Sequence, residues 1–340
     1  MKTWKRGTLV LFIATMAAVA GCSSSGSPKE ALMDAITKTS KAKSFTYQGT
    51  FTINDIQLPQ APDTDSAQNA MLRMALPILL KGAVIQVHGA VQQDPQRAEL
   101  TLNATLGTGD VKLTVNIPII VTADQIYVKV PQIPGVPIPE KIADRFVVID
   151  AKKLAEEQGG TNPLDGGAPN LGTAAFAALV DSLEEKTYFS EPAAGDVKDV
   201  PSGYKADRYV SVGIDGQHSE AALTAIAGKA IPQVIDLLLQ NEAVLKSFGL
   251  TQERLEDAKK QLTADKMKEQ YTIRKAEITG GITDGYLTFE SGDLQVDATE
   301  PSKGMKMNIH FQLSQDDINK EVKFEAELPK DAVPVDELAP

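Results

Sequence analysis

Long runs in which apolar and polar residues alternate are the feature that most constrains the fold of this chain. In the segment 44–54, Phe45, Tyr47, Phe51 and Ile53 stand at odd positions, and the even positions are polar. A period of two residues is typical of a β-strand with one buried face. We therefore expect a sheet with one apolar face, which must be covered.

Twelve segments show this pattern or part of it, which predicts about eleven strands. Short turns between most of them favour antiparallel pairing, and the fold class expected is α+β: a curved antiparallel sheet, or incomplete β-barrel, packed on apolar helices. The expected strand segments are 44–54, 82–91, 97–106, 110–121, 125–130, 144–150, 204–215, 269–279, 285–291, 293–299, 304–314 and 321–328.

A helical period appears in a short stretch after residue 28 and in insertions near 63–82, 170–186 and 219–268. The first insertion is apolar nearly all round towards its end, so it must be buried or must cover an apolar surface. We expect Pro77 and Pro232 to kink their helices, and Gly249 to cap the C-terminus of the last apolar one.

The N-terminal 22 residues have the pattern of a secretory signal. Lys2, Lys5 and Arg6 precede an apolar stretch that is too short for a comfortable transmembrane helix. Val19-Ala20-Gly21-Cys22 matches a bacterial lipobox, in which the cysteine becomes a diacylated N-terminus. The alternative is an ordinary signal peptide with a chance cysteine. We expect a signal peptide over 1–21, a lipidated flexible tether over 22–29 and a location on the extracytoplasmic face of the cell envelope.

Composition excludes several classes of function. Cys22 is the only cysteine, so disulfides, cysteine metal sites and thiol nucleophiles are excluded. The net charge of −11 gives no electrostatic attraction to the phosphates of a nucleic acid. We expect one domain over 30–332, a C-terminal tail over 333–340, and a monomer that contacts the membrane through its diacylglyceryl cysteine.

No catalytic constellation can be assembled from the sequence. His88, His218 and His310 are far apart, and two of them lie on polar strand faces, which favours surface histidines. The S-x-x-K match at 40–43 lacks its partner motifs. Acidic pairs such as 63/65 and 316/317 could bind calcium weakly, but they lack EF-hand spacing, so helix capping and solvation explain them better. We expect no cofactor, no metal and no enzyme activity.

What covers the apolar face of the sheet decides the function. If helices fill the space completely, the protein has an ordinary core; if they leave room, a pocket for acyl chains results. The sequence leaves both possibilities open.

The chain resembles the LppX/LprG-type bacterial lipoproteins, which share the half-barrel fold of the LolA/LolB lipoprotein carriers. The resemblance is carried by the lipobox, by the strand and helix order, and by an opening motif with Ala35, Thr39, Lys43-Ser44 and Gly49. It implies a carrier that holds a lipid or acylated molecule under its helices. The lining residues implied are Leu72, Leu76, Leu79, Leu80, Ile231, Val234, Leu237 and Leu238.

The expected function is therefore binding of a hydrophobic ligand for transport or sensing, with release through helix movement at the two proline kinks. The first alternative is a structural or sensory envelope lipoprotein with a filled core that binds a partner protein. The second is a solute-binding component of an importer. Proteins of that class are built from alternating strand–helix units, and the consecutive strands of this chain argue against it.

Overall fold

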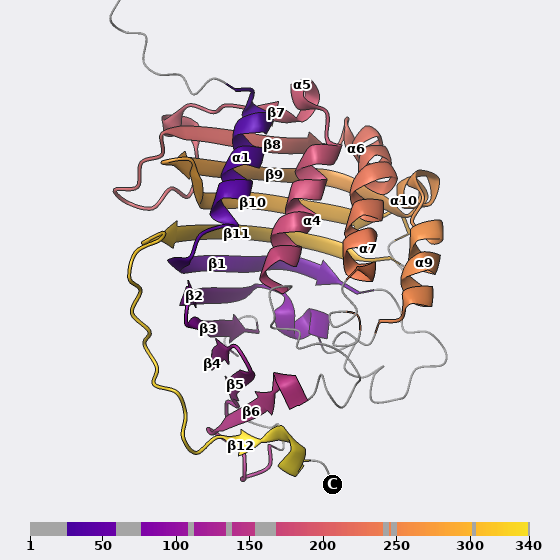
Figure 1. Cartoon of the computed structure of the whole chain (residues 1–340). Helices are drawn as coiled ribbons and strands as arrows, with labels where there is room; N and C mark the ends of the chain where they lie inside the picture. The colour runs from indigo at the N-terminus through magenta and orange to yellow at the C-terminus, as the bar shows by residue number, and fades with distance from the viewer. Residues whose placement is uncertain are drawn as a thin grey trace, which may run out of the picture.

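A large, unclosed sheet of 12 strands forms the framework of the protein in the computed structural model (Figure 1). The structure describes residues 26–58, 76–107, 112–133, 138–153, 168–240, 245, 250–300 and 304–338. The strand order is β12-β6-β5-β4-β3-β2-β1-β11-β10-β9-β8-β7, and every pair except β12–β6 is antiparallel. The fold class is α+β, as the alternating sequence pattern predicts.

The strands are β1 Ser44–Gln57, β2 Ala83–Gln93, β3 Gln96–Leu106, β4 Leu113–Thr122, β5 Gln125–Lys129, β6 Phe146–Asp150, β7 Phe189–Ser190, β8 Arg208–Asp215, β9 Tyr271–Thr283, β10 Tyr286–Ala298, β11 Lys306–Asp316 and β12 Val333–Pro334. The helices are α1 Pro28–Thr39, α4 Ala168–Ser182, α5 Glu185–Tyr188, α6 Ser219–Ala225, α7 Ile231–Leu239, α9 Gln252–Gln261 and α10 Ala264–Gln270, with a π-helical segment η2 at Ile226–Ala230 and 3₁₀ turns η1 at Ala194–Asp196 and η3 at Val335–Leu338.

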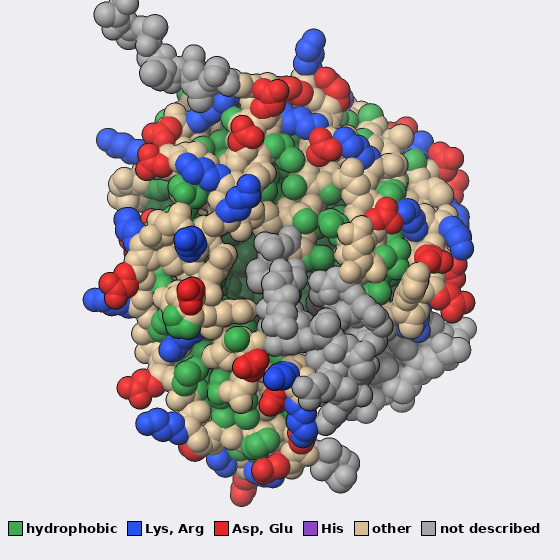
Figure 2. Space-filling model, viewed as in Figure 1, with side chains coloured by type: hydrophobic (Ala, Val, Ile, Leu, Met, Phe, Trp, Pro, Cys, Tyr) green, Lys and Arg blue, Asp and Glu red, His purple; other side chains and the backbone are tan. Residues whose placement is uncertain are grey.

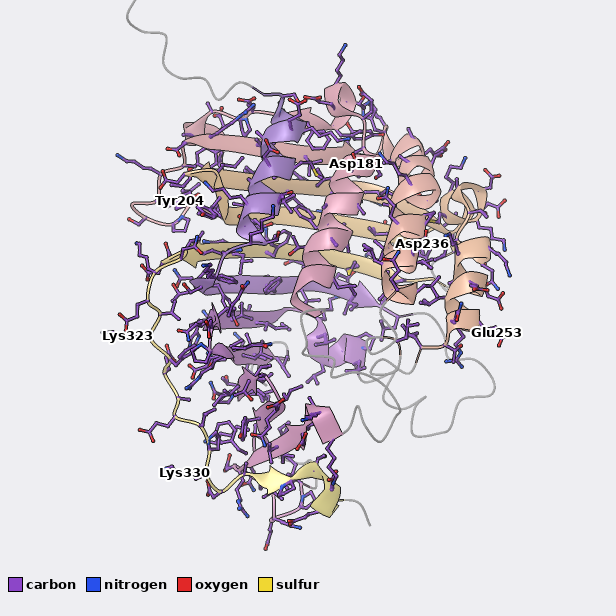
Figure 3. The ribbon with its side chains drawn as sticks, viewed as in Figure 1. Asp181, Tyr204, Asp236, Glu253, Lys323 and Lys330 are labelled. Carbon is purple, nitrogen blue, oxygen red and sulfur yellow. The ribbon has the colours of Figure 1, made fainter. Side chains whose placement is uncertain are left out.

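Helices α1, α4, α6 and α7 all lie over one face of the sheet (Figure 1). The main core forms where α1, α4 and α6 pack on β8, β9 and β10, and Val180 and Val210 are almost fully buried there. The Asp181 carboxylate, at the C-terminal end of α4, forms ion pairs with Lys29 of α1 at 3.9 Å and with Lys229 of η2 at 2.7 Å (Figure 3). This carboxylate therefore joins three helical segments above the sheet.

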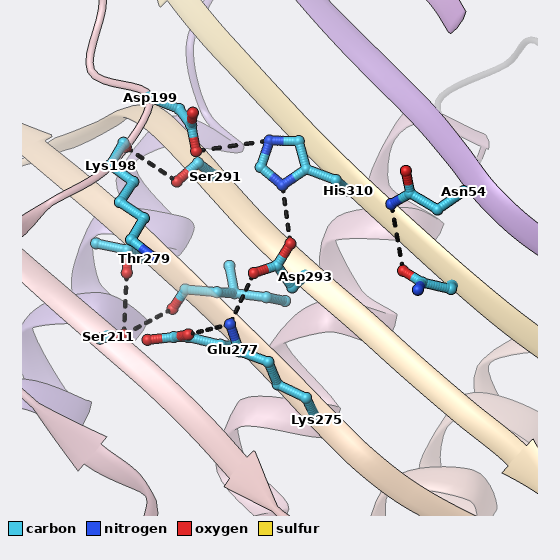
Figure 4. A network of polar contacts seen from close by, with 12 residues as sticks. Asn54, Lys198, Asp199, Ser211, Lys275, Glu277, Thr279, Ser291, Asp293 and His310 are labelled. Atoms are coloured by element: carbon cyan, nitrogen blue, oxygen red, sulfur yellow. Dashed lines mark hydrogen bonds and ion pairs between the residues drawn. The ribbon is translucent and has the colours of Figure 1, made fainter. Parts of the chain in front are cut away.

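The opposite face of the sheet is polar and carries a network of ion pairs (Figure 4). Asp293 on β10 accepts from Lys275 on β9 at 2.7 Å and contacts His310 on β11 at 2.9 Å. The hydrogen bond from Lys275 lowers the pKa of Asp293. An antiparallel sheet can be wetted on one face, and these ion pairs occupy the face opposite the helices around β9, β10 and β11.

Helix α1 starts at a complete capping box. The Ser27 hydroxyl accepts a hydrogen bond from the Glu30 backbone, the Glu30 carboxylate accepts one from the Ser27 backbone, and Pro28 occupies the first turn. These contacts satisfy two amide groups that a helix end otherwise leaves unpaired. The cap fixes the point at which α1 turns onto the sheet.

Replacing the cap should weaken the fold measurably. We expect Ser27→Ala to lower the free energy of unfolding by about 1 kcal/mol, because the Glu30 amide loses its acceptor. Ser27→Asp should retain wild-type stability, since aspartate is an equally good N-cap. Pulse proteolysis of the full chain across a urea series measures both; equal losses in the two variants would contradict the capping role.

The apolar helical run from Ser219 to Leu239 passes Pro232 without a break. The π-helical segment precedes the proline, and the amide of Ile231 reaches back five residues to the Ile226 carbonyl. The wider π-helical turn accommodates Pro232, which has no backbone N–H to donate to the preceding turn. Among the described residues, this is the one helix long and apolar enough to cross a membrane by length and composition, a test that core helices also pass.

Four details of the strand and helix prediction differ from the structure. Segments 285–291 and 293–299 form the single strand β10, and 321–328 forms no strand although it alternates. The last part of the helical insertion expected near 219–268 is divided into α9 and α10 at Leu262. The chain at 333–334 pairs with β6, and η3 follows it.

Candidate functional site

A cavity of about 860 Å³ lies between helices α1 and α4 and the apolar face of the sheet. Figure 2 shows this face of the molecule hollowed near its centre, with hydrophobic side chains in the recess. The described lining residues are Ile36, Thr39, Ser40, Ala42, Phe45, Val91, Gln92, Gln93, Gln96, Arg97, Ala98, Val121, Gly172, Thr173, Phe176, Leu287, Glu290 and Gln315. The volume is within the range of small-molecule binding sites.

The apolar floor of the cavity is one row of cross-strand neighbours. Phe45 on β1 pairs with Val91 on β2, Val91 with Ala98 on β3, and Ala98 with Val121 on β4. Directly opposed residues of an antiparallel sheet point to the same face. The alternating pattern of four strands therefore places these side chains together beneath the helices.

Small residues keep this space open. Ala98 is the smallest side chain in the row, and Gly172 on α4 carries no side chain. A Cβ atom added at Gly172 would have no other atom within 4 Å. One turn further along α4, Phe176 packs against the main core. Helix α4, which forms the roof of the cavity, is therefore fixed to the core by Phe176 and leaves open space beside Gly172.

A β-bulge in β10 directs an acid into this apolar space. The register of β10 against β9 shifts between Leu287 and Phe289, so Thr288 and Phe289 both turn towards Tyr204 on the far face. As a result Leu287 and Glu290 both line the cavity. Bulges commonly redirect a side chain in this way.

Glu290 has an unusual environment for a carboxyl group. Its side chain is half-buried because it borders the cavity, and burial raises its pKa to about 7. Among the described residues it has no hydrogen-bond or ion-pair partner. Gln315 on the adjacent strand also lines the cavity, and its Oε1 is buried without a hydrogen bond. Two unpaired oxygen-bearing groups therefore face an apolar space.

A second, smaller hollow of about 440 Å³ involves the polar face of the sheet and the segment after β11. There the Glu99 carboxylate accepts from the backbone amides of Glu325 and Ala326, at 2.7 Å and 3.3 Å. Arg97 contacts the same carboxylate at 2.6 Å and lies over the Phe324 ring. These contacts hold the segment 324–326 against the sheet, so this hollow is better explained as the attachment of the C-terminal segment.

The described residues among those that the family resemblance implies as cavity lining lie elsewhere. Leu72 falls outside the described residues, Leu76 and Leu80 are half-buried in a helical turn over 76–80, and Leu79 is 39% exposed. None of the described ones is among the residues that line the cavity.

The second implied set lies on α7, away from the cavity. Ile231 and Leu238 pack in a small core with Ile235, Leu245 and Leu255, while Val234 and Leu237 are half-buried on the same helix. An ion pair of 2.5 Å between Lys259 and Asp236 also joins α7 to α9. The most apolar helix is therefore occupied by its neighbouring helix, and the cavity lies under the less apolar α1 and α4.

Sequence reasoning did not single out Gly172, Glu290 or Gln315 as site residues. The available signal was weak: Glu290 follows Thr288 at the spacing of a polar strand face, which places it on the outer face of a regular strand.

The histidines and acidic clusters form no catalytic or metal centre within the described ranges. His88, His218 and His310 each contact a carboxylate, and no group of three or more potential ligands of the kind that binds a metal occurs there. Comparison of the chain with protein-family models and with curated proteins finds no match.

Proposed function

We propose that this protein is a membrane-anchored, extracytoplasmic lipoprotein that binds a lipid or acylated molecule in the cavity under α1 and α4, for transport or sensing. The observation that carries the proposal is the cavity of about 860 Å³ with an apolar floor. An apolar surface such as this floor gains free energy from each CH₂ group that leaves water to cover it. Such a site binds acyl chains without any catalytic group.

Two further features support this proposal. The lipobox ending at Cys22 would hold the domain within a tether length of a membrane, where lipid ligands are found. An unclosed sheet with helices on one face is also the arrangement expected of a LolA/LppX-like half-barrel, and we propose that fold family for this chain. Release would then require α1 or α4 to move away from the sheet.

Photo-crosslinking from the roof of the cavity tests this function. Phe176→p-benzoylphenylalanine keeps an aromatic ring in place, and we expect ultraviolet irradiation of cells expressing the full chain to give a lipid-sized adduct at residue 176. The control is the same substitution at Leu328, which is 43% exposed and outside the cavity. Mass spectrometry of the tryptic peptides identifies the adducts.

Each outcome of this test decides between the two main functions. A discrete lipid adduct at 176 that is absent at 328 supports a carrier. Protein adducts at 328 with none of lipid mass at 176 would overturn the proposal in favour of a scaffold that binds a partner protein through its surface.

A further inference from the structure

The strongest unexplained feature of the cavity is its pair of unpaired polar groups on adjacent strands. Glu290 on β10 pairs with Leu313 on β11, and Gln315 lies two residues beyond Leu313 on the same face. An unpaired polar group in an apolar space is costly unless a partner arrives. The bulge at Thr288 makes this placement specific, because a regular strand would have turned Glu290 to the polar face.

Most other polar lining groups already have partners in the protein. Thr39 accepts from the Leu287 backbone at 2.8 Å, Ser40 donates to Thr37 at 2.9 Å, and Gln93 donates to the Ala42 carbonyl at 2.9 Å. The amide of Gln92 donates to the Pro95 carbonyl at 3.1 Å.

Arg97 is the other ionisable residue among the described lining residues. Its Nη2 donates to the Glu99 carboxylate and to the Ala326 carbonyl, while its Nε is buried without a hydrogen bond. On the helix side, no described lining residue of α1 or α4 is ionisable. Arg97 is ion-paired with Glu99, so no described lining residue of these elements forms an ion pair with Glu290.

We propose that Glu290 and Gln315 anchor the head group of the ligand, and that the ligand is an amphiphile whose head donates hydrogen bonds, such as a primary amine or a hydroxyl group. This inference rests on the proposed function, because it assumes that the chain of the amphiphile occupies the apolar cavity. Both unpaired groups offer oxygen acceptors, so a donor head satisfies them together. A carboxylate head brings only acceptors at neutral pH and a like charge towards Glu290.

The ionisation of Glu290 adds a distinguishing property. Burial places its pKa at about 7, so the carboxylate form becomes dominant as the pH rises through a window of roughly one unit on either side of this value. An ammonium head is attracted to the carboxylate, so its binding should strengthen as the pH rises. A hydroxyl head can donate to the carboxyl in either state, so its binding should change less.

Three photoreactive probes test the inference on the full chain in lipid nanodiscs. Each probe has a 16-carbon chain with a diazirine near its end, and the head is an amine, an alcohol or a carboxylic acid. Labelling of tryptic peptide 82–97, which carries Val91 of the floor, is divided by labelling of α9 peptides, which removes differences in membrane partitioning. We expect the amine and the alcohol to label the floor about tenfold more than the acid at pH 7.5.

The variants identify the groups responsible for the preference. Glu290→Leu should reduce the preference for donor heads to about one, and Gln315→Leu should weaken it, while labelling by the chain persists. Glu290→Gln keeps the size and a hydrogen-bonding head but removes the charge, so the pH dependence of amine labelling should disappear. Glu327→Gln, an exposed site outside the cavity, is the control and should behave as wild type.

The failure of this inference is distinguishable from failure of the proposed function. Strong floor labelling by all three probes alike, or an unchanged preference in a folded Glu290→Leu variant, would overturn the head-group anchor and leave lipid binding intact. Absence of floor labelling by every probe would overturn the proposed function itself.

Discussion

The Glu290→Gln variant should be more stable than the wild type by about 2 kcal/mol at pH 8 and by only about 0.5 kcal/mol at pH 5. Burial holds the pKa of Glu290 at about 7 in the folded protein, against an ordinary value of 4.5. The folded state therefore binds more protons than the unfolded state between these values. Stability contributed by this group is fully present below about pH 4.5 and is lost as the pH rises through 7.

The size of this effect follows from the shift in pKa. Each unit of difference between the folded and unfolded pKa corresponds to about 1.4 kcal/mol of unfolding free energy. Glu290 borders the cavity, where solvent screens its charge, so the expected change in unfolding free energy is reduced to about 2 kcal/mol. Glutamine has the shape of protonated glutamate and no charge to bury. It therefore avoids the loss at high pH without changing the packing.

Pulse proteolysis in urea from pH 5 to pH 8, on the full chain in nanodiscs, measures the difference. Carboxylates with lowered pKa, such as Asp55 beside Lys306 and Asp181 beside Lys229, contribute stability that is lost on acidification. Their contribution is common to both proteins and cancels in the comparison. Glu327→Gln is the matched control and should show no pH-dependent difference. A constant difference between Glu290→Gln and wild type at all pH values would contradict the assigned environment of Glu290.

The sheet was predictable because its signal is local. A period of two residues identifies a strand wherever one face is buried, and β1 to β4 and β11 were anticipated nearly to their ends. The Gly292-Asp293 pair in β10 looks like a turn, but the glycine has another reason. A Cβ atom there would lie 2.5 Å from the Glu277 carbonyl and 2.8 Å from the Phe311 ring. The glycine permits close contact between strands and does not end the strand.

Segment 321–328 shows the opposite error. It alternates like a strand, but it lies against the polar face, where Glu99 takes the amides of Glu325 and Ala326 and Arg97 stacks on Phe324. A buried carboxylate from a distant strand competes for the backbone donors, and a local pattern cannot reveal this.

The cavity could be expected from the fold class but not located from the sequence. Hydrophobicity singles out the α7 helix, whose apolar side packs with Leu245 and Leu255. The cavity depends instead on the absent side chain of Gly172 and on the small side chain of Ala98. It also depends on the β-bulge that turns Glu290 from the polar face to the cavity. A missing side chain and a shift of one residue leave little periodic signal. Long-range packing, which no single segment encodes, therefore determines the site.

Filling the cavity from its roof should abolish ligand binding without harming the fold. Gly172→Trp places an indole where a Cβ atom has no neighbour within 4 Å, on the same side of α4 as Phe176. We expect labelling of the floor peptide 82–97 by the 16-carbon alcohol probe to fall by at least about tenfold, because the bulky ring occupies space that the chain needs. The free energy of unfolding should stay level or rise by about 0.5 kcal/mol, since glycine is a poor residue inside a helix.

Gly228→Trp is the matched control for this change. Gly228 is also helical and exposed, a Cβ atom there also has no neighbour within 4 Å, and it does not line the cavity. The control should keep wild-type labelling and show a similar change in stability. Ala98→Trp tests the same space from the floor, in a different element. Wild-type labelling in both folded variants, Gly172→Trp and Ala98→Trp, would show that acyl chains bind somewhere else; loss in these two alone would locate the chain between α4 and the sheet.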